Sequence, residues 1–203
     1  VFAALQGFLS AKEEKSVPVL AIFDNEEVGS GTKQGARSTF LSDVLYRITK
    51  SAGGDRDDMT RFLSNSFMIS ADNAHAVHPN NISVADPTNR PAINGGIVIK
   101  YNANQRYTTD GVSAALFKMI LEKAGVKYQT FHNRSDILGG GTLGNISNTR
   151  VAVNTVDIGL PQLAMHSAYE TAGVKDTEDF IRASNTFYEC EIEKQGDDMY
   201  IIK

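Results

Sequence analysis

The run Val17-Pro-Val-Leu-Ala-Ile-Phe23, followed at once by Asp24-Asn25, decides the expected fold. An uncharged apolar run that ends at a polar turn is typical of a strand buried on both faces of a sheet. We therefore expect a central β-strand at 17–23. Beyond a glycine-rich turn, apolar residues recur at helical spacing from Phe40 to Ile48, and Gly53-Gly54 stops the pattern. The sequence thus predicts a strand followed by a helix.

Strand and helix patterns alternate through the rest of the chain. Strands are expected at 66–71, 96–101, 128–131 and 151–158, with a long polar loop over 72–94. Helices are expected from an Asp110 cap to Gly125, and from an acid-rich turn at Asp176 to a point before Gly196. Such alternation favours a single-domain α/β fold, in which a central, mostly parallel or mixed sheet carries helices on both faces.

Composition narrows the class of protein. The 203 residues carry a net charge of −4, and Lys and Arg are scattered without forming a basic run, so we expect no nucleic-acid partner. The longest apolar runs are far shorter than the roughly 18 residues that span a bilayer, so no membrane segment is expected. The single cysteine, Cys190, excludes an internal disulfide and favours a reducing, cytoplasmic location.

Polar side chains gather where three expected strands end. The segments are Asp24-Asn25-Glu26-Glu27-Val28-Gly29-Ser30, Ser70-Ala71-Asp72-Asn73-Ala74-His75-Ala76-Val77-His78-Pro79 and Leu163-Ala164-Met165-His166-Ser167. Taken singly, adjacent glutamates more often form a solvated turn, and a lone histidine more often has a structural role. Together, their carboxylates and imidazole are the oxygen and nitrogen ligands that zinc accepts. The set therefore predicts a metal site at strand ends.

The glycine-rich loop Gly139-Gly140-Gly141-Thr142-Leu143-Gly144 leaves an alternative open. It contains the pattern G-x-G-x-x-G, and Asp157 ends the next expected strand, so a nucleotide-binding module is one possibility. The polar segment 132–136 stands where that motif requires a strand, and the following helix is too short for a crossover. A metal-free assembly domain is a third possibility. No G-x-S-x-G pattern exists, and Cys190 lacks a nearby histidine, which disfavours serine and cysteine nucleophiles.

The three polar segments, extended to Asn80 in the second and back to Pro161 in the third, resemble the active-site motifs of aspartyl aminopeptidases, relatives of yeast vacuolar aminopeptidase I. Val98-Ile99-Lys100 and Gln105-Arg106-Tyr107 resemble the same family, so that the likeness covers nearly the whole chain.

The resemblance implies a metalloaminopeptidase that removes N-terminal residues, Asp or Glu by preference, from peptides by two-zinc hydrolysis. It implies that Glu26 is the general base, that Glu27 and His166 bind one zinc, and that Asp72 binds the other. Lys100 resembles a family residue that meets the acidic side chain of the substrate. Tyr107 and His75 are weaker candidates for the same pocket. No further cofactor is implied.

The resemblance also implies that parts of the enzyme are missing from this segment. The family's bridging aspartate and first histidine ligand, and an inserted domain that supports large homo-oligomers, come before the position that Val1 resembles. We therefore expect residues 1–203 to be the C-terminal part of the catalytic domain and to be inactive alone. Peptide substrates and homo-oligomer assembly belong to the complete enzyme.

Overall fold

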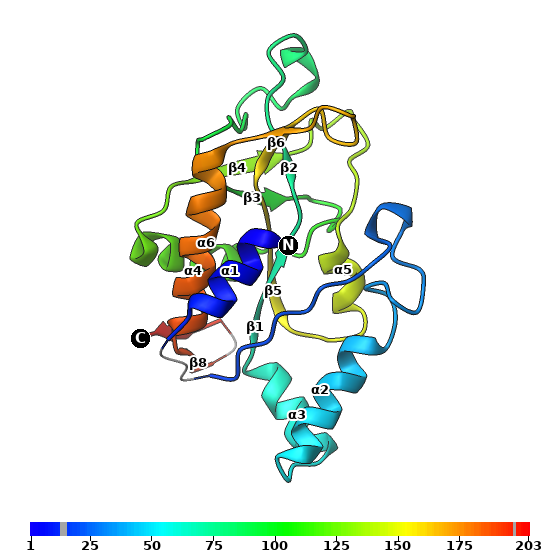
Figure 1. Ribbon diagram of the computed structural model, residues 1–203, viewed down its shortest axis with the longest axis vertical. Helices are drawn as coiled ribbons and strands as arrows, with labels where there is room; N and C mark the ends of the chain where they lie inside the picture. The colour runs from blue at the N-terminus through cyan, green and yellow to red at the C-terminus, as the bar shows by residue number, and fades with distance from the viewer. Residues whose placement is uncertain (13–15, 197) are drawn as a thin grey trace.

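A four-stranded sheet forms the centre of the structure, a computed structural model that describes residues 1–12, 16–196 and 198–203 (Figure 1). In spatial order its strands are β1 (Phe67–Ala71), β5 (Asn154–Gly159), β3 (Ile97–Tyr101) and β4 (Tyr128–His132). β1 is parallel to β5 and β3 is parallel to β4, whereas β5 and β3 are antiparallel. The expectation of a mixed sheet in an α/β fold is confirmed.

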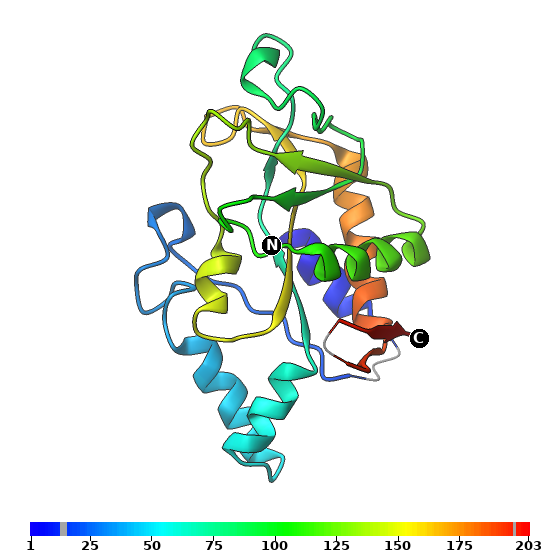
Figure 2. The ribbon, with the colours of Figure 1, turned by 180° about the vertical axis from the view of Figure 1, so that it is seen from behind.

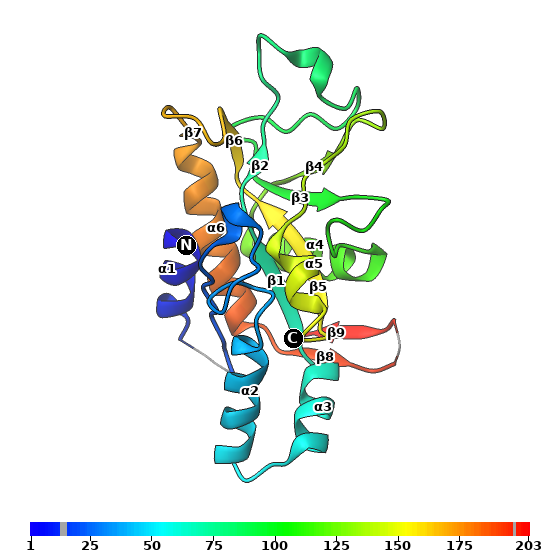
Figure 3. The same ribbon diagram turned by 90° about the vertical axis from the view of Figure 1, so that its right-hand side faces the viewer.

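The main hydrophobic core lies on one face of this sheet. Here α4 (Gly111–Ala124) and α6 (Val174–Glu189) pack on inward-facing residues of β3 and β5, and α1 (Phe2–Ser10) packs on α6. The other face carries α5 (Leu143–Asn148). Figure 1 shows α1, α4 and α6 on one side of β1 and β5 with α5 on the other, and Figure 2 shows the same arrangement from behind. Figure 3 is seen from the side on which α5 lies. Fully buried members of the core are Ile97, Ile99, Phe117, Ile120, Leu121, Val156 and Ala183.

Local sequence signals set the ends of α4 as expected. Asp110 and Ser113 form a capping box, in which the Asp110 carboxylate accepts from the Ser113 backbone N–H at 2.7 Å. Gly125 ends the helix with φ 63°, a left-handed conformation that glycine adopts without steric cost. These two caps set the first and last residues of α4, the helix that connects β3 to β4.

The central strand expected at 17–23 is wrong, because no described strand pairs with this segment. Val17 and Ile22 are 60% and 52% exposed, whereas a strand inside a sheet needs hydrogen-bonded neighbours on both sides. Ile97, Val98 and Ile99 of β3 are instead fully buried on both faces. β3 is therefore, together with β5, an inner strand of the described sheet.

A second, smaller core lies where 17–23 runs past two helices. Ala21 and Phe23 pack against a cluster that joins α2 (Phe40–Ser51) and α3 (Arg56–Ser64) to the sheet, and both helices extend away from the sheet at one end (Figure 1). The helix expected between Phe40 and Gly53 is confirmed, and it ends at Ser51.

Short elements complete the fold. The polar loop 72–94 contains β2 (Ala74–His75) and the 3-10 turn η2 (Ile82–Val84); β2 joins a small sheet with β6 (Pro161–Leu163) and β7 (Thr171–Ala172). A second 3-10 turn, η1, spans Glu26–Val28. β8 (Ile192–Lys194) and β9 (Tyr200–Ile202) form a hairpin near the end of the chain. Among the described helices, none has both the length and the apolar composition needed to cross a bilayer.

The first turn of α6 is tied to the start of β3 by a buried carboxylate. α6 begins at Val174, two residues before the expected Asp176. Asp176 is fully buried and accepts hydrogen bonds from the backbone N–H groups of Asn94 at 2.6 Å and Gly96 at 2.9 Å. This contact holds the chain in place just before β3, the strand that carries Lys100.

We predict that Asp176→Ala lowers the free energy of unfolding by about 2 to 4 kcal/mol, because two buried N–H groups lose their acceptor. Urea unfolding followed by circular dichroism measures the change. Glu178→Ala is the matched control, because Glu178 lies in the same helical turn but is exposed. Equal losses in the two variants would show that the contact contributes nothing beyond the interaction of an acidic residue with the helix dipole.

Candidate functional site

A cleft of about 760 Å³ contains every site residue that the sequence analysis singled out. Lys100 projects into it from the face of β3 opposite Ile99, so the cleft lies over the face of the sheet that carries α5. The site was expected at strand ends alone. In this mixed sheet the cleft also includes Lys100, which lies within β3. The predicted residues that line it are Glu26, Glu27, Asp72, His75, Lys100, Tyr107 and His166.

Two loops with unusual backbone conformations bring Glu27 and His166 together. The turn η1 starts after Asn25, with φ 60°, and the second loop places Ala164 at φ 56° and His166 at φ 68°. Left-handed conformations are uncommon outside glycine, and they cluster at functional sites. As a result, Glu27 Oε2 lies 2.7 Å from His166 Nε2, although the two side chains are 69% and 66% exposed.

The described residues of the cleft include side chains of the kinds that bind zinc. Carboxylate and imidazole are the right donors for zinc, and Glu27 and His166 already converge. Asp72 instead lies 3.4 Å from the Lys100 ammonium, measured from Oδ2 to Nζ. Within the part of the chain that the structure describes, no group of three or more His, Cys, Asp or Glu side chains could hold a metal ion. A catalytic zinc usually has three protein ligands, so these residues fit an incomplete set.

The electrostatics of the cleft shift several pKa values. Burial, with the negative charges of Asp72 and Glu27, raises the pKa of Glu26 above its ordinary value. Burial lowers the pKa of Lys100, which is only 2% exposed, while the charges of Asp72 and Asp157 oppose that change. Glu26 is therefore easier to protonate than an exposed glutamate, which suits a group that exchanges protons.

One aromatic ring lies next to the buried ammonium, and it belongs to a group of rings in the cleft. Lys100 Nζ lies 5.6 Å from the centre of the Tyr107 ring, and Tyr107 and His75 each contact Phe131. Burial, helped by the charge of Asp157, raises the pKa of Tyr107 to about 12, so its hydroxyl remains neutral at physiological pH. Burial also lowers the pKa of His75. Lys100 is thus a buried cation that lies between the Tyr107 ring and the Asp72 carboxylate.

The glycine-rich loop forms a wall of this cleft, a role that its sequence pattern did not indicate. Gly139, Gly140, Gly141 and Thr142 all line it, and Arg106 Nη1 donates to the Gly139 carbonyl at 3.0 Å. β4 ends at His132, well before the first glycine, and α5 is only six residues long. The strand, loop and helix of a dinucleotide site are therefore not formed here.

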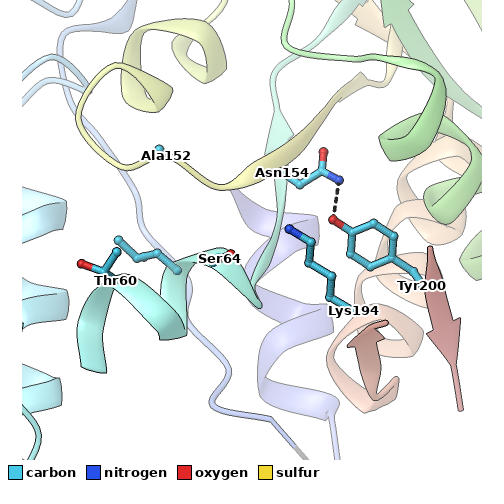
Figure 4. A pocket seen from close by; sticks show the side chains of 7 residues that line it. Thr60, Ser64, Ala152, Asn154, Lys194 and Tyr200 are labelled. Atoms are coloured by element: carbon cyan, nitrogen blue, oxygen red, sulfur yellow. Dashed lines mark hydrogen bonds between the residues drawn. The ribbon is translucent and has the colours of Figure 1, made fainter. Parts of the chain in front are cut away.

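A second pocket, of about 310 Å³, lies between α3, β5 and the β8–β9 hairpin (Figure 4). Asn154 Nδ2 donates to the Tyr200 hydroxyl at 3.1 Å inside it. Among the residues that the structure describes, Lys194 and Tyr200 are the lining residues with an ionisable group. It contains none of the predicted site residues, so the first cleft is the candidate active site.

Comparison with known proteins places the chain among peptidases. Residues 1–188 match a family model described as aminopeptidase I zinc metalloprotease (M18). A curated relative from Clostridium acetobutylicum, named "Probable M18 family aminopeptidase 2", is 56% identical over 176 residues, which cover 87% of this chain and 41% of the relative. A protein of the same name from Mycobacterium tuberculosis is 42% identical over 195 residues, covering 94% of this chain and 45% of the relative. The chain thus spans less than half the length of these relatives.

Solved structures show the same likeness. An M18 aminopeptidase from Thermotoga maritima has a TM-score of 0.84 and 30% sequence identity, covering 93% of this chain and 43% of that chain. A structure described as the S. cerevisiae mApe1 dodecamer has a TM-score of 0.72 and 32% identity, covering 82% of this chain and 36% of that chain. The fold and the sequence motifs therefore point to one family.

The packing of the glycine-rich loop leads to a prediction at Gly144. A Cβ atom there would lie 2.5 Å from Ser70 Oγ and 2.6 Å from Asp157 Oδ1. We expect Gly144→Ala to lower the free energy of unfolding by roughly 1 to 3 kcal/mol through overpacking, in spite of the better helix propensity of alanine. Gly140→Ala is the matched control, because nothing lies within 4 Å of its added Cβ. Thermal unfolding that is equally unchanged in both variants would contradict this tight contact.

Proposed function

Because the chain belongs to the M18 family of zinc aminopeptidases, we propose that it is the C-terminal catalytic part of an aminopeptidase that removes N-terminal Asp or Glu residues from peptides. One observation carries the proposal: a single cleft contains two adjacent glutamates, an imidazole, a further carboxylate and a buried lysine. These residues come from three loops and from β3, which are far apart in the sequence. The family name implies that the substrate is a peptide with a free α-amino group.

We assign proton transfer to Glu26. Its half-buried carboxylate, whose pKa is raised by burial, takes a proton from the attacking water and delivers it to the leaving amine. Glu27 and His166 would hold one zinc ion, and Asp72 would help to hold a second. Zinc, when bound, supplies polarisation of the scissile carbonyl and a water that is acidic enough to attack near neutral pH. Adjacent glutamates thus divide proton transfer and metal binding between them.

We assign substrate selection to Lys100. The Lys100 ammonium, which is 2% exposed and lies over the Tyr107 ring, favours a ligand that brings its own negative charge. A charge-assisted hydrogen bond from Lys100 to a substrate carboxylate contributes roughly 1.5 to 3 kcal/mol, which is enough for a clear preference for Asp and Glu over neutral residues. His75 stands next to the same pocket and would contact the substrate there.

The remaining metal ligands are proposed to lie outside this chain. Glu27, Asp72 and His166 provide one or two ligands for each of two zinc ions, fewer than a catalytic zinc requires. The 203 residues alone would therefore bind zinc weakly and hydrolyse no peptide. We further propose that the complete enzyme works in the cytoplasm as a large homo-oligomer, in line with the dodecamer named for a yeast relative and with the single, buried Cys190.

The assignment of the two glutamates predicts different losses. In the enzyme at the full length of its relatives, Glu26→Gln should reduce kcat by at least about a hundredfold while bound zinc is retained, because only the proton acceptor is lost. Glu27→Gln should lose zinc, because an amide oxygen is a weaker ligand than a carboxylate. Steady-state kinetics with Asp-p-nitroanilide and elemental analysis measure the two effects.

Asp24→Asn is the control, because Asp24 is an exposed carboxylate in the same motif that does not line the cleft. A Glu26→Gln enzyme that keeps most of its turnover would show that the general base lies elsewhere.

The assignment of Lys100 predicts a change in selectivity. Lys100→Met should reduce kcat/KM for Asp-p-nitroanilide at least about tenfold relative to Leu-p-nitroanilide, because the charge-assisted hydrogen bond is lost. Lys127→Met removes an exposed lysine from the loop between α4 and β4 and should leave the ratio unchanged. An unaltered ratio in Lys100→Met would remove this residue from the specificity pocket.

A further inference from the structure

Asp157 is a carboxylate buried beneath the cleft without reaching it. It lies on β5 with none of its surface exposed, and both of its oxygens accept hydrogen bonds. Oδ2 accepts from the backbone N–H of Thr108 at 2.5 Å and from the Thr108 hydroxyl at 2.8 Å. Oδ1 accepts from the Thr142 hydroxyl at 2.9 Å. A buried carboxylate is stable only when it is paired in this way, so these three donors are held where Asp157 places them.

The backbone of Asp157 strengthens the same link. The Thr109 hydroxyl accepts from the Asp157 N–H at 2.8 Å and donates to the Asp157 carbonyl at 3.3 Å. Residues 108 and 109 are therefore fixed to β5 by side chain and backbone together. Gly144 packs directly on the carboxylate, which brings the start of α5 onto the same point.

Both segments that Asp157 holds are walls of the cleft. Tyr107, immediately before Thr108, lines the cleft beside Lys100. Thr142 ends the run of glycines that forms another wall. The antiparallel register of β3 and β5 also places Lys100 next to Asp157, so that the lysine has a negative charge on a neighbouring strand in addition to Asp72. The Asp157 carboxylate thus contacts or faces three parts of the cleft, which are the segment after Tyr107, the glycine-rich loop and Lys100.

We propose that Asp157 is a positioning residue, which fixes the Tyr107–Thr108 segment and the glycine-rich loop as walls of the substrate cleft. The proposal rests on the proposed function, since the cleft must be a substrate site. Asp157 does not contact the substrate; it acts through Tyr107, Thr142 and Lys100. Loss of its hydrogen bonds should therefore weaken substrate binding more than the chemical step.

The test measures KM and kcat for Asp-p-nitroanilide in the enzyme at the full length of its relatives. Asp157→Asn keeps the shape of the side chain but presents an NH₂ group to one of its donors, so we expect KM to rise about tenfold or more with a smaller change in kcat and unchanged zinc content. Thr142→Val, which removes the one hydroxyl that reaches Oδ1, should raise KM in the same direction. Thr142→Ser restores the hydroxyl and should recover most of that loss.

Thr155→Val is the control for a purely structural effect. Thr155 is buried on the same strand, and its hydroxyl donates to the Val153 carbonyl at 2.7 Å, away from the cleft. We expect it to lower the melting temperature while KM stays at the wild-type value. Should Asp157→Asn not fold, the Thr142→Val and Thr142→Ser pair decides the question.

The outcomes separate this proposal from the function on which it rests. A full-length wild-type enzyme that hydrolyses no aminoacyl substrate would contradict the proposed function. If the wild type is active but Asp157→Asn and Thr142→Val leave KM unchanged, the positioning role is wrong while the proposed function stands. The same holds if Thr155→Val raises KM as much as they do.

Discussion

The cleft depends on two opposite charges that are buried on neighbouring strands. Lys100 on β3 is 2% exposed and Asp157 on β5 is fully buried. Each would be too costly to bury without compensation, so the surrounding chain is arranged to satisfy both. Thr108 and Thr142 meet the carboxylate, while Asp72 approaches the ammonium. The loops that line the cleft are therefore positioned by their contacts with the buried Asp157 and Lys100, and not only by the ends of strands.

Much of the fold was predictable because its signals are local. The Asp110 cap, the Gly125 stop and the apolar run of β3 each act within a few residues, and all three were found where the sequence placed them. The segment 17–23 has an equally clear apolar pattern, yet it forms no described strand. A strand is defined by its hydrogen-bonded neighbours, and a pattern within one segment cannot show whether those neighbours are present.

The candidate site was predictable only as a list of residues. The motifs and the family resemblance named the seven predicted residues, and all of them line one cleft. Their arrangement could not be foreseen. The contact between Glu27 and His166 depends on left-handed backbone at Ala164 and His166, which neither residue type signals. The role of the glycine-rich loop depends on Asp157, whose partners are up to 49 residues away in the sequence.

We propose that this chain carries part of a zinc site whose other ligands lie outside residues 1–203. The most direct measurement compares zinc content and hydrolysis of Asp-p-nitroanilide for the enzyme at the full length of its relatives and for residues 1–203 alone. We expect about two zinc ions per chain and rapid hydrolysis for the full-length enzyme, as for two-metal peptidases, with weak zinc binding and no hydrolysis for the segment. Hydrolysis by the segment near the full-length rate, or a full-length enzyme that works without metal, would contradict it.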